Sequence, residues 1–264
     1  MPEKYKAVIL DVDDTVVRSS RWALPSVEVI KAVSSAKHEG VAVHLATARP
    51  HRRVARVMRA LRIEDDCVLD GGAVIFDPVS GSPKVEEILH PKAQEQALDI
   101  CEEFDVKVYD SANQYGGNPV FKRQVAPGNT KLFVEGVVTD VADQMIGRFN
   151  QVDEINAFTA TSWKPGEVVD IHITDKMVSK RSGVELLMKM NGLDREEVVA
   201  IGDSPIDIPM FEAVGTSFAM AGAPPEVVAK ATYEAPSLEE DGVAWALRKF
   251  VLDCAGVECM PVTA

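Results

Sequence analysis

The chain has 264 residues, of which 46% are hydrophobic and 26% are charged. At roughly 150 residues per domain, we expect one large or two modest domains with a sizeable core. This composition excludes a disordered, collagen-like or coiled-coil array. The 28 basic and 41 acidic residues give a formal net charge of −13. Because such a charge repels a phosphodiester backbone, nucleic acid is not an expected partner.

No apolar run approaches the roughly 20 residues that a membrane span requires, so no membrane partner is expected. The first four residues do not have the charged and apolar regions of a secretory leader. A cytoplasmic protein is therefore the expectation. The four cysteines show no zinc-ligand spacing, which indicates reduced structural thiols at Cys67, Cys101, Cys254 and Cys259.

The first part of the chain alternates apolar runs with helical patterns, and this alternation predicts a parallel sheet covered by helices. The expected strands are residues 7–12, 41–46 and 68–69, and the expected helices are residues 25–39 and 50–61. A turn-rich segment follows at residues 77–83. It marks either a domain boundary or a hairpin that leaves the sheet.

A second unit follows, with helices expected at residues 91–104 and 141–149 and strands at 106–109, 131–134, 155–160 and 168–173. The alternation of strands and helices seen in the first part of the chain then resumes. Helices are expected at residues 180–190 and 243–252, and strands at 198–201 and 217–220. The predicted fold class is α/β. A Rossmann-like parallel-sheet core takes residues 1–81 and 174–264, and a smaller α+β domain is inserted at residues 82–173.

Six arginines recur along and beside the helix expected at residues 50–61. They could form an anion-binding stripe, but in this acidic chain we favour a solvated helix face made of Arg49, Arg52, Arg53, Arg56, Arg59 and Arg62.

The first expected strand runs directly into three carboxylates, Asp11, Asp13 and Asp14, which burial alone would not favour. Ligands of open α/β sheets bind beyond the carboxyl ends of the strands, and Asp11 and Asp13 lie two residues apart, facing one side. Their mutual repulsion favours a bound cation or a raised pKa on one of them. The alternative is an acidic strand end with Asp14 as a turn residue.

A second apolar strand ends at Gly202 and is followed by Asp203 and Asp207. Asp207 could be only the N-cap of a helix that contains Pro209, whereas for Asp203 we favour a metal-ligand role over a turn role. Four carboxylates then converge on one sheet edge. Hard oxygen ligands in this number suit Mg²⁺.

Lys180 and Thr47 are expected near the same edge. Lys180 follows a plausible N-cap, Ser179, so its ammonium lies in the first turn of a helix, where the macrodipole disfavours a cation. A phosphate group bound at that helix end would be stabilised by the positive charge of Lys180. A lysine that only extends to water is an equally favoured interpretation. Thr47 follows the second expected strand, so its hydroxyl also lies at this sheet edge. A single threonine there indicates little, and it becomes a candidate only because the two carboxylate clusters and Lys180 are expected at the same edge.

Taken together, residues 11–15, Thr47, Lys180 and residues 202–207 resemble the four ordered motifs of the haloacid dehalogenase superfamily. The large insert and the residues 224–228 and 240–243 resemble the Cof-type, class IIB phosphatases of that superfamily. The motifs cover nearly the whole chain, and the ordered set is far more specific than any one motif. The resemblance implies a catalytic core and an inserted cap that determines substrate specificity.

The resemblance implies a phosphatase mechanism with catalytic residues Asp11, Asp13, Thr47 and Lys180. Asp11 would attack phosphorus and become an aspartyl phosphate, and Asp13 would protonate the leaving oxygen and then activate water. Mg²⁺ would be held by Asp11, Asp203 and the backbone carbonyl of Asp13, with Asp207 as a further or indirect ligand. Thr47, Ala48 and Lys180 would bind the phosphoryl group.

The sequence departs from the usual motifs at five places, one of which is residues 221–223, where an asparagine is often seen. Asp14 and Ala48 stand where glycine is common, and Asp207 stands where asparagine is common. Asp70 stands in place of a usual asparagine and is expected to face the pocket.

Polar residues on the insert are the candidates for substrate contact, with Arg123 and Lys164 favoured because basic groups suit anionic substrates. The full set is Asn113, Tyr115, Asn118, Lys122, Arg123, Lys164 and His172, and roughly one in four should touch substrate. His172 could equally be a satisfied strand residue.

The expected substrate is a small phosphorylated metabolite, either a sugar phosphate or a phospho-acid such as phosphoglycolate. A sugar phosphomutase of the same superfamily is the alternative, and a requirement for a bisphosphate activator would distinguish it. A non-catalytic phosphometabolite-binding module is less favoured, because Asp11 and Asp13 are both present. A monomer or small homo-oligomer is expected.

Overall fold

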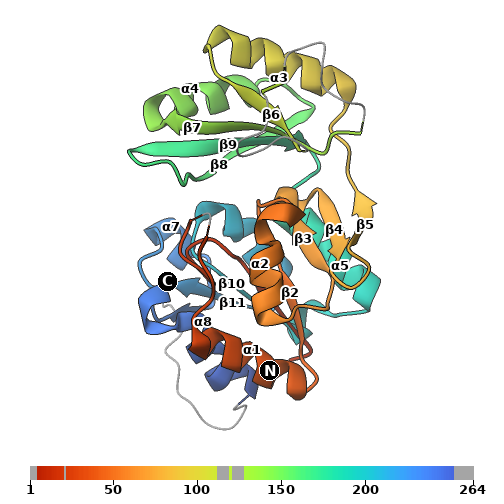
Figure 1. The fold of residues 1–264 in the computed structure, drawn as a ribbon, viewed down its shortest axis with the longest axis vertical. Helices are drawn as coiled ribbons and strands as arrows, with labels where there is room; N and C mark the ends of the chain where they lie inside the picture. The colour runs from red at the N-terminus through yellow and green to blue at the C-terminus, as the bar shows by residue number, and fades with distance from the viewer. Residues whose placement is uncertain (1–4, 21, 112–118, 121–127, 253–264) are drawn as a thin grey trace.

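The computed structural model describes residues 5–20, 22–111, 119–120 and 128–252 (Figure 1). Its centre is a five-stranded parallel sheet in the order β12-β11-β10-β1-β2. These strands are β1 (Ala7–Leu10), β2 (Ala42–Leu45), β10 (Val198–Gly202), β11 (Thr216–Met220) and β12 (Tyr233–Ala235). β1 lies between β10 and β2, so the chain that leaves its carboxyl end is flanked by the ends of two other strands.

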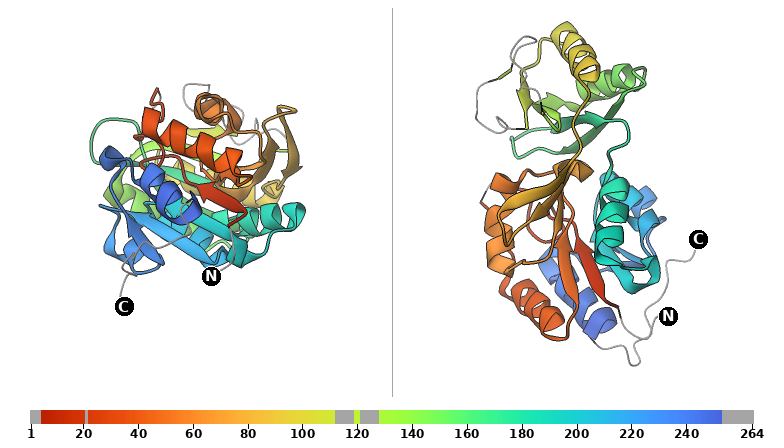
Figure 2. Two further views of the ribbon diagram at one scale, coloured as in Figure 1. Left: turned by 90° about the horizontal axis from the view of Figure 1, so that it is seen from below. Right: turned by 90° about the vertical axis from the view of Figure 1, so that its right-hand side faces the viewer.

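Both faces of this sheet are covered, which explains why its strands are nearly continuous apolar runs. Val8 and Leu10 of β1 pack in the cluster that contains α1 (Val27–His38), whereas Ala7 and Ile9 pack in the cluster that contains α5 (Lys180–Asn191). Successive strand residues point to opposite faces, so each face receives every second side chain. In the right-hand view of Figure 2, α1 and α2 (His51–Leu61) lie on one side of the strands and α5 on the other.

The turn-rich segment at residues 77–83 forms a hairpin. β4 (Val74–Asp77) pairs antiparallel with β3 (Cys67–Leu69) on one side and with β5 (Ser82–Glu86) on the other. β3 is therefore not a member of the five-stranded sheet, although a parallel bridge from Ala46 to Val68 joins the two sheets.

A second sheet, antiparallel and four-stranded, lies above the carboxyl edge of the first (Figure 1). Its order is β6-β7-β9-β8, with β6 (Val108–Asp110), β7 (Leu132–Val138), β8 (Ile155–Thr161) and β9 (Val168–Asp175). α3 (Pro91–Glu103) and α4 (Thr139–Phe149) cover one face with a hydrophobic cluster of its own. The opposite face is turned toward the parallel sheet, so alternate residues of β8 and β9 point at its carboxyl edge.

The expected helices and strands are present wherever the structure describes them, with shifted ends. Two short elements, β12 and α7 (Pro225–Val228), were not anticipated, because a few residues carry no readable period. β4 and β5 form the hairpin that was one of two alternatives, and α6 (Ile208–Ala213) is the helix that contains Pro209. The helix expected at residues 243–252 consists of α8 (Gly242–Ala246) and a π-helical segment, Leu247–Leu252. The domain boundaries at residues 82 and 174 stay a prediction.

Two smaller expectations concern membranes and cysteines. Within the described ranges, no helix combines the length and hydropathy of a membrane span. Cys67 and Cys101 are buried free thiols, and burial raises the pKa of each to about 12. Cys254 and Cys259 lie outside the described residues.

Gly72, between β3 and β4 of the three-stranded sheet, packs closely against Ser179, the residue before α5. Its φ is +119°, and a Cβ there would lie 2.0 Å from the carbonyl oxygen of Ser179. We expect Gly72→Ala to lower the free energy of unfolding by at least about 3 kcal/mol, because left-handed strain adds to the overlap. Gly81→Ala is the matched control: its φ is +70°, but no atom lies within 4 Å, so only about 1 kcal/mol is expected. Urea unfolding measures both, and equal losses would contradict this account.

Candidate active site

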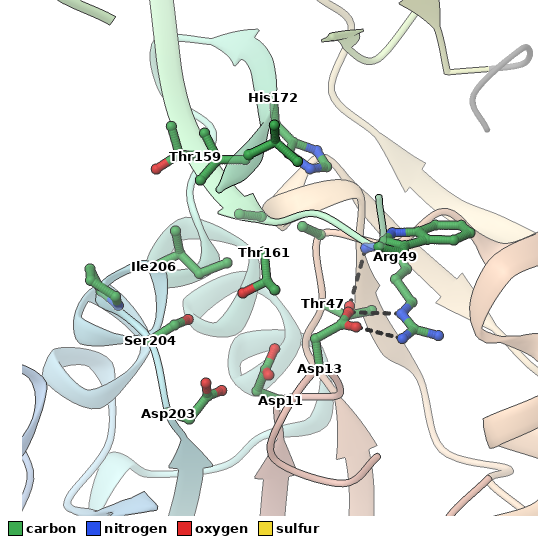
Figure 3. Close-up of a pocket in the computed structure, with 16 residues that line it drawn as sticks. Asp11, Asp13, Thr47, Arg49, Thr159, Thr161, His172, Asp203, Ser204 and Ile206 are labelled. Atoms are coloured by element: carbon green, nitrogen blue, oxygen red, sulfur yellow. Dashed lines mark hydrogen bonds and ion pairs between the residues drawn. The ribbon is translucent and has the colours of Figure 1, made fainter. Parts of the chain in front are cut away.

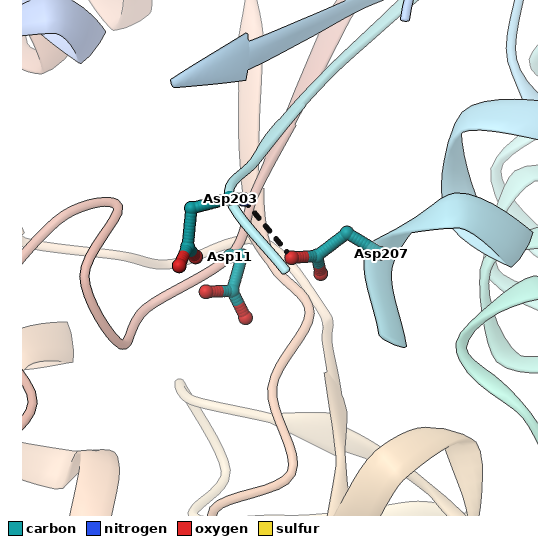
Figure 4. A group of neighbouring side chains, drawn as sticks. All are labelled: Asp11, Asp203 and Asp207. Carbon is teal, nitrogen blue, oxygen red and sulfur yellow. Dashed lines mark hydrogen bonds between the residues drawn. The ribbon is translucent and has the colours of Figure 1, made fainter. Parts of the chain in front are cut away.

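Carboxylates meet where β1 and β10 end. Asp11 follows β1, Asp203 follows β10, and Asp207 lies four residues further, in a 3₁₀ turn, Pro205–Asp207 (Figure 4). One carboxylate oxygen from each of these residues lies within 4.8 Å of the others. Asp11 is 4% exposed and Asp207 is fully buried, so this charge is largely removed from water.

Lys180 offsets part of that charge. It is the first residue of α5, and Ser179 caps the helix by accepting from the backbone N–H of Ser182. The Lys180 ammonium lies 2.5 Å from Oδ1 of Asp207 and also donates to Oδ1 of Asp11. Burial lowers the Lys180 pKa, but the two carboxylates outweigh it and raise that pKa overall. These carboxylates explain why a cation occupies the unfavourable first turn of a helix.

Asp207 also holds the loop that carries Asp203. Its Oδ2 accepts from the backbone N–H groups of Asp203 and Ser204, at 3.1 and 3.0 Å. Its side chain makes no capping hydrogen bond to α6, so the simple N-cap interpretation does not describe it. A Cβ on Gly202 would lie 2.5 Å from the Asp207 carboxyl carbon, which explains the glycine.

The surroundings of Asp11, Asp203 and Asp207 favour either a proton on one of these carboxylates or a cation bound between them. Burial, followed by the charge of Asp207, raises the pKa of Asp11 well above its ordinary value, although Lys180 opposes the shift. The same causes raise the pKa of Asp203 to about 7, while Thr15 opposes the shift by donating to Oδ1 at 2.9 Å. Three carboxylates and one ammonium leave excess negative charge in a buried place, so this oxygen donor set fits a divalent cation.

Asp13 is held by Arg49. The Nε and Nη2 atoms of Arg49 donate to the two Asp13 oxygens at 2.8 and 2.5 Å, and Arg49 is only 5% exposed. The prediction that Arg49 belongs to a solvated face is therefore wrong, because it precedes α2 and turns into the site. Arg53 is also partly covered, 4.8 Å above the Trp163 ring. The solvated face is correct for Arg52, Arg56, Arg59 and Arg62.

The segment after β2 is fixed on several sides. Thr47 is 1% exposed; its N–H donates to Val68 and its carbonyl accepts from Gly71. Its hydroxyl accepts from the N–H of Arg49 at 3.1 Å. The next carbonyl, that of Ala48, accepts from the ammonium of Lys131 at 2.6 Å.

These groups surround a cavity of about 270 Å³ (Figure 3). Its floor comes from the edge of the parallel sheet: Asp11, Asp13, Thr47, Ala48, Arg49 and Asp203. The facing wall comes from the antiparallel sheet and the loop after β8, with Thr159, Thr161, Trp163 and His172 among its residues. Lys180 lines an adjoining cavity of about 410 Å³.

Several expected substrate contacts are not at this cavity or are not described. Lys164 does not line it; its ammonium lies 3.1 Å from the Glu135 carboxylate. Asp70 is buried and paired with Lys131 at 2.8 Å rather than facing the pocket. The remaining expected contacts lie outside the described residues: Asn113, Tyr115, Asn118, Lys122 and Arg123.

Sequence analysis missed Lys131 and the threonines of β8. Thr159, Ala160 and Thr161 all line the cavity, so no alternation along β8 could have indicated the two threonines. Lys131 precedes an apolar strand and gave no signal. Asp14, where glycine is common in the motif, has φ +54°, which is the conformation that glycine adopts most easily.

The model of the haloacid dehalogenase-like hydrolase family matches residues 8–247. A putative phosphatase from Streptococcus pyogenes is 26% identical over 94% of this chain and 99% of its own length. A phosphoglycolate phosphatase from Methanothrix thermoacetophila is 28% identical over 90% of this chain and 94% of its own. The chain therefore belongs to the haloacid dehalogenase-like hydrolase family, and these relatives are named phosphatases.

Solved structures show the same fold. A phosphatase of this superfamily from Bacteroides thetaiotaomicron has a TM-score of 0.77 at 19% identity, covering 94% of this chain and 96% of its own. A subclass IIB sugar phosphatase has a TM-score of 0.76 at 19% identity, covering 93% and 98%.

The raised pKa of Asp203 predicts how stability depends on pH without metal. Because the folded chain binds this proton more tightly than the unfolded chain, the stabilisation is full below about pH 4 and is lost as pH rises through about 7. In chelator, we expect wild type to lose about 1 kcal/mol or more of unfolding free energy relative to Asp203→Asn between about pH 4.5 and 8.

Urea unfolding at both pH values measures this difference. Asp153→Asn is the matched control, because the Asp153 side chain is 99% exposed. A wild-type-minus-Asp203→Asn difference that stays flat with pH would contradict the assignment.

Proposed function

We propose that this protein is a Mg²⁺-dependent phosphomonoester hydrolase that acts on a small phosphorylated metabolite through an aspartyl phosphate on Asp11. One observation carries the proposal: Asp11 stands on the cavity floor between the Lys180 ammonium and the carboxyl group of Asp13, which Arg49 holds in place. A nucleophile and an acid–base group thus line one cavity, and a charge for the phosphoryl oxygens contacts the nucleophile from the adjoining cavity.

The reaction proceeds in two displacements. A carboxylate oxygen of Asp11 attacks phosphorus, the bond from phosphorus to the ester oxygen breaks, and Asp13 gives its proton to that oxygen. Water then attacks the phosphoryl group on Asp11, Asp13 takes its proton, and inorganic phosphate leaves. The two bonds from Arg49 keep the Asp13 carboxyl group oriented toward the cavity in both steps.

The phosphoryl oxygens are bound by groups that the fold places in advance. Thr47 and Ala48 offer a hydroxyl and backbone on a segment fixed by Val68, Gly71 and Lys131. Lys180 supplies positive charge beside Asp11. Because these groups do not move to meet the charge that develops, they stabilise it more than water would.

Asp11, Asp203 and the backbone carbonyl of Asp13 would hold Mg²⁺. Asp207 is committed through both oxygens, to Lys180 and to the backbone of the Asp203 loop, so it would act by placing Asp203. The bound ion supplies positive charge that shields the Asp11 carboxylate from the phosphate dianion.

We propose that residues 1–81 and 174–264 form the catalytic core and that residues 82–173 form a cap that selects the substrate. The separate hydrophobic cluster of the antiparallel sheet supports this division. The named relatives include a phosphoglycolate phosphatase and the structural neighbours a sugar phosphatase, so a phospho-acid and a sugar phosphate are the two substrate classes to compare.

Asp11→Asn tests the proposal. The amide cannot attack phosphorus, so we expect inorganic phosphate release from the best substrate of a sugar-phosphate and phospho-acid panel to fall at least about 1,000-fold. Asp14→Asn is the matched control, because it makes the same change outside the cavity lining and asparagine tolerates the left-handed backbone. Release that survives Asp11→Asn, or is absent from wild type with Mg²⁺ on the whole panel, would contradict the proposal.

A further inference from the structure

A buried lysine on the antiparallel sheet reaches the core of the molecule. Lys131, just before β7, is completely buried, and its ammonium has three acceptors. They are the carbonyl oxygen of Ala48 at 2.6 Å, Oδ1 of Asp70 at 2.8 Å and Nδ1 of His172 at 3.2 Å. The contacts with Ala48 and His172 are hydrogen bonds and the contact with Asp70 is an ion pair, so the ammonium is held by three groups.

This arrangement determines which ring nitrogen of His172 carries the proton. The ammonium of Lys131 has no lone pair, so it must donate to Nδ1, which therefore has no hydrogen. A second proton on the ring is disfavoured, because burial and then the charge of Lys131 hold the His172 pKa well below its ordinary value. The ring is therefore neutral, with its hydrogen on Nε2.

The position of the ring is fixed by aromatic neighbours. Phe158, its partner on β8, stacks on it with centroids 5.2 Å apart, and Phe133 on β7 meets it edge-on at 5.0 Å. His172 is 1% exposed and lies on the cavity wall. Among the residues that the structure describes, Nε2 has no hydrogen-bond partner.

Figure 3 places His172 and Thr159 across the cavity from Asp11, Asp13 and Asp203. A monoester whose phosphoryl group lies against Asp11 therefore extends its leaving group toward this wall. Nε2 of His172 is not among the fully buried unpartnered atoms, so it reaches the cavity, where an oxygen of the substrate can accept its hydrogen in place of water.

We propose that His172 is a specificity-determining residue whose Nε2–H donates to an oxygen of the leaving group beyond the ester oxygen, and that Lys131 is the positioning residue that fixes this donor. The proposal rests on the phosphatase function above. It requires a hydroxyl, carbonyl or carboxylate oxygen on the leaving group. Through the Ala48 carbonyl, the same ammonium also joins this recognition to the phosphoryl-binding segment.

Two substitutions distinguish the role of Nε2 from the role of Nδ1 in the His172 ring. The amide of glutamine reaches the position of Nε2, whereas that of asparagine reaches only the position of Nδ1. With glycerol 3-phosphate, ribose 5-phosphate or 2-phosphoglycolate, whichever wild type hydrolyses, we expect His172→Asn to lower kcat/KM about tenfold, mainly through KM, and His172→Gln to stay within about threefold. Phenyl phosphate, whose leaving group has no second oxygen, should be hydrolysed equally by all three proteins.

The pattern of losses distinguishes the two proposals. Equal kcat/KM for wild type and His172→Asn on every hydrolysed ester, or an equal loss on phenyl phosphate, would overturn the role of His172. No hydrolysis of any ester by wild type would instead contradict the phosphatase itself. If only 2-phosphoglycolate shows the loss, the acceptor is a carboxylate; if only the other two show it, the acceptor is a hydroxyl or carbonyl oxygen.

The tautomer is measurable without turnover. Nitrogen-15 NMR of the His172 ring in wild type should show a protonated Nε2 and an unprotonated Nδ1. In Lys131→Met combined with Asp70→Asn, which removes the ion pair as a whole, we expect a mixture of tautomers once circular dichroism shows a folded chain. A protonated Nδ1 in wild type would overturn the proposal.

Discussion

Three charged side chains with almost no exposure to solvent, Asp11, Lys180 and Asp207, meet at the carboxyl edge of the parallel sheet. Each is costly to bury alone, and removing one partner would leave an uncompensated charge. Because β1 lies between β10 and β2 and α5 packs against it, the arrangement depends on the packing of both faces of the sheet. The buried, apolar strands therefore fix the distance between Asp11 and Lys180.

Lys131 is a second buried cation with a related role. It joins the antiparallel sheet, through His172, to the segment that contains Thr47 and Ala48. The wall over the cavity and the segment that contains Thr47 and Ala48 are thus held by a single ammonium. A molecule built in this way can change the leaving group it accepts by altering β8 and β9, while the carboxylates of the floor stay in place.

Much of the fold follows from sequence periodicity. The strands that carry Asp11 and Asp203 are apolar runs that end in carboxylates, and the rule that ligands bind beyond such ends brings these residues together. The helical spacing of apolar residues equally predicted long amphipathic helices such as α2. The hairpin of β4 and β5 was one of two alternatives, because turn residues alone do not say which strands pair.

The rest of the site depends on contacts between segments far apart in the chain. Arg49 was assigned to a solvated face because arginines repeat along α2, and only the position of Asp13 reveals its partner. Lys131 and His172 are 41 residues apart, and neither has a local pattern that predicts the other. Lys164, a plausible anion contact by charge, instead pairs with Glu135 on its own sheet.

The most direct measurement is to trap the intermediate. Wild-type protein should be mixed with Mg²⁺ and its best monoester, quenched in acid, reduced with borohydride and digested for peptide mapping by mass spectrometry. Borohydride converts an aspartyl phosphate into homoserine, so the account predicts homoserine at position 11 and at no other aspartate. Phosphate release without modification of Asp11, or with modification of another residue, would contradict it.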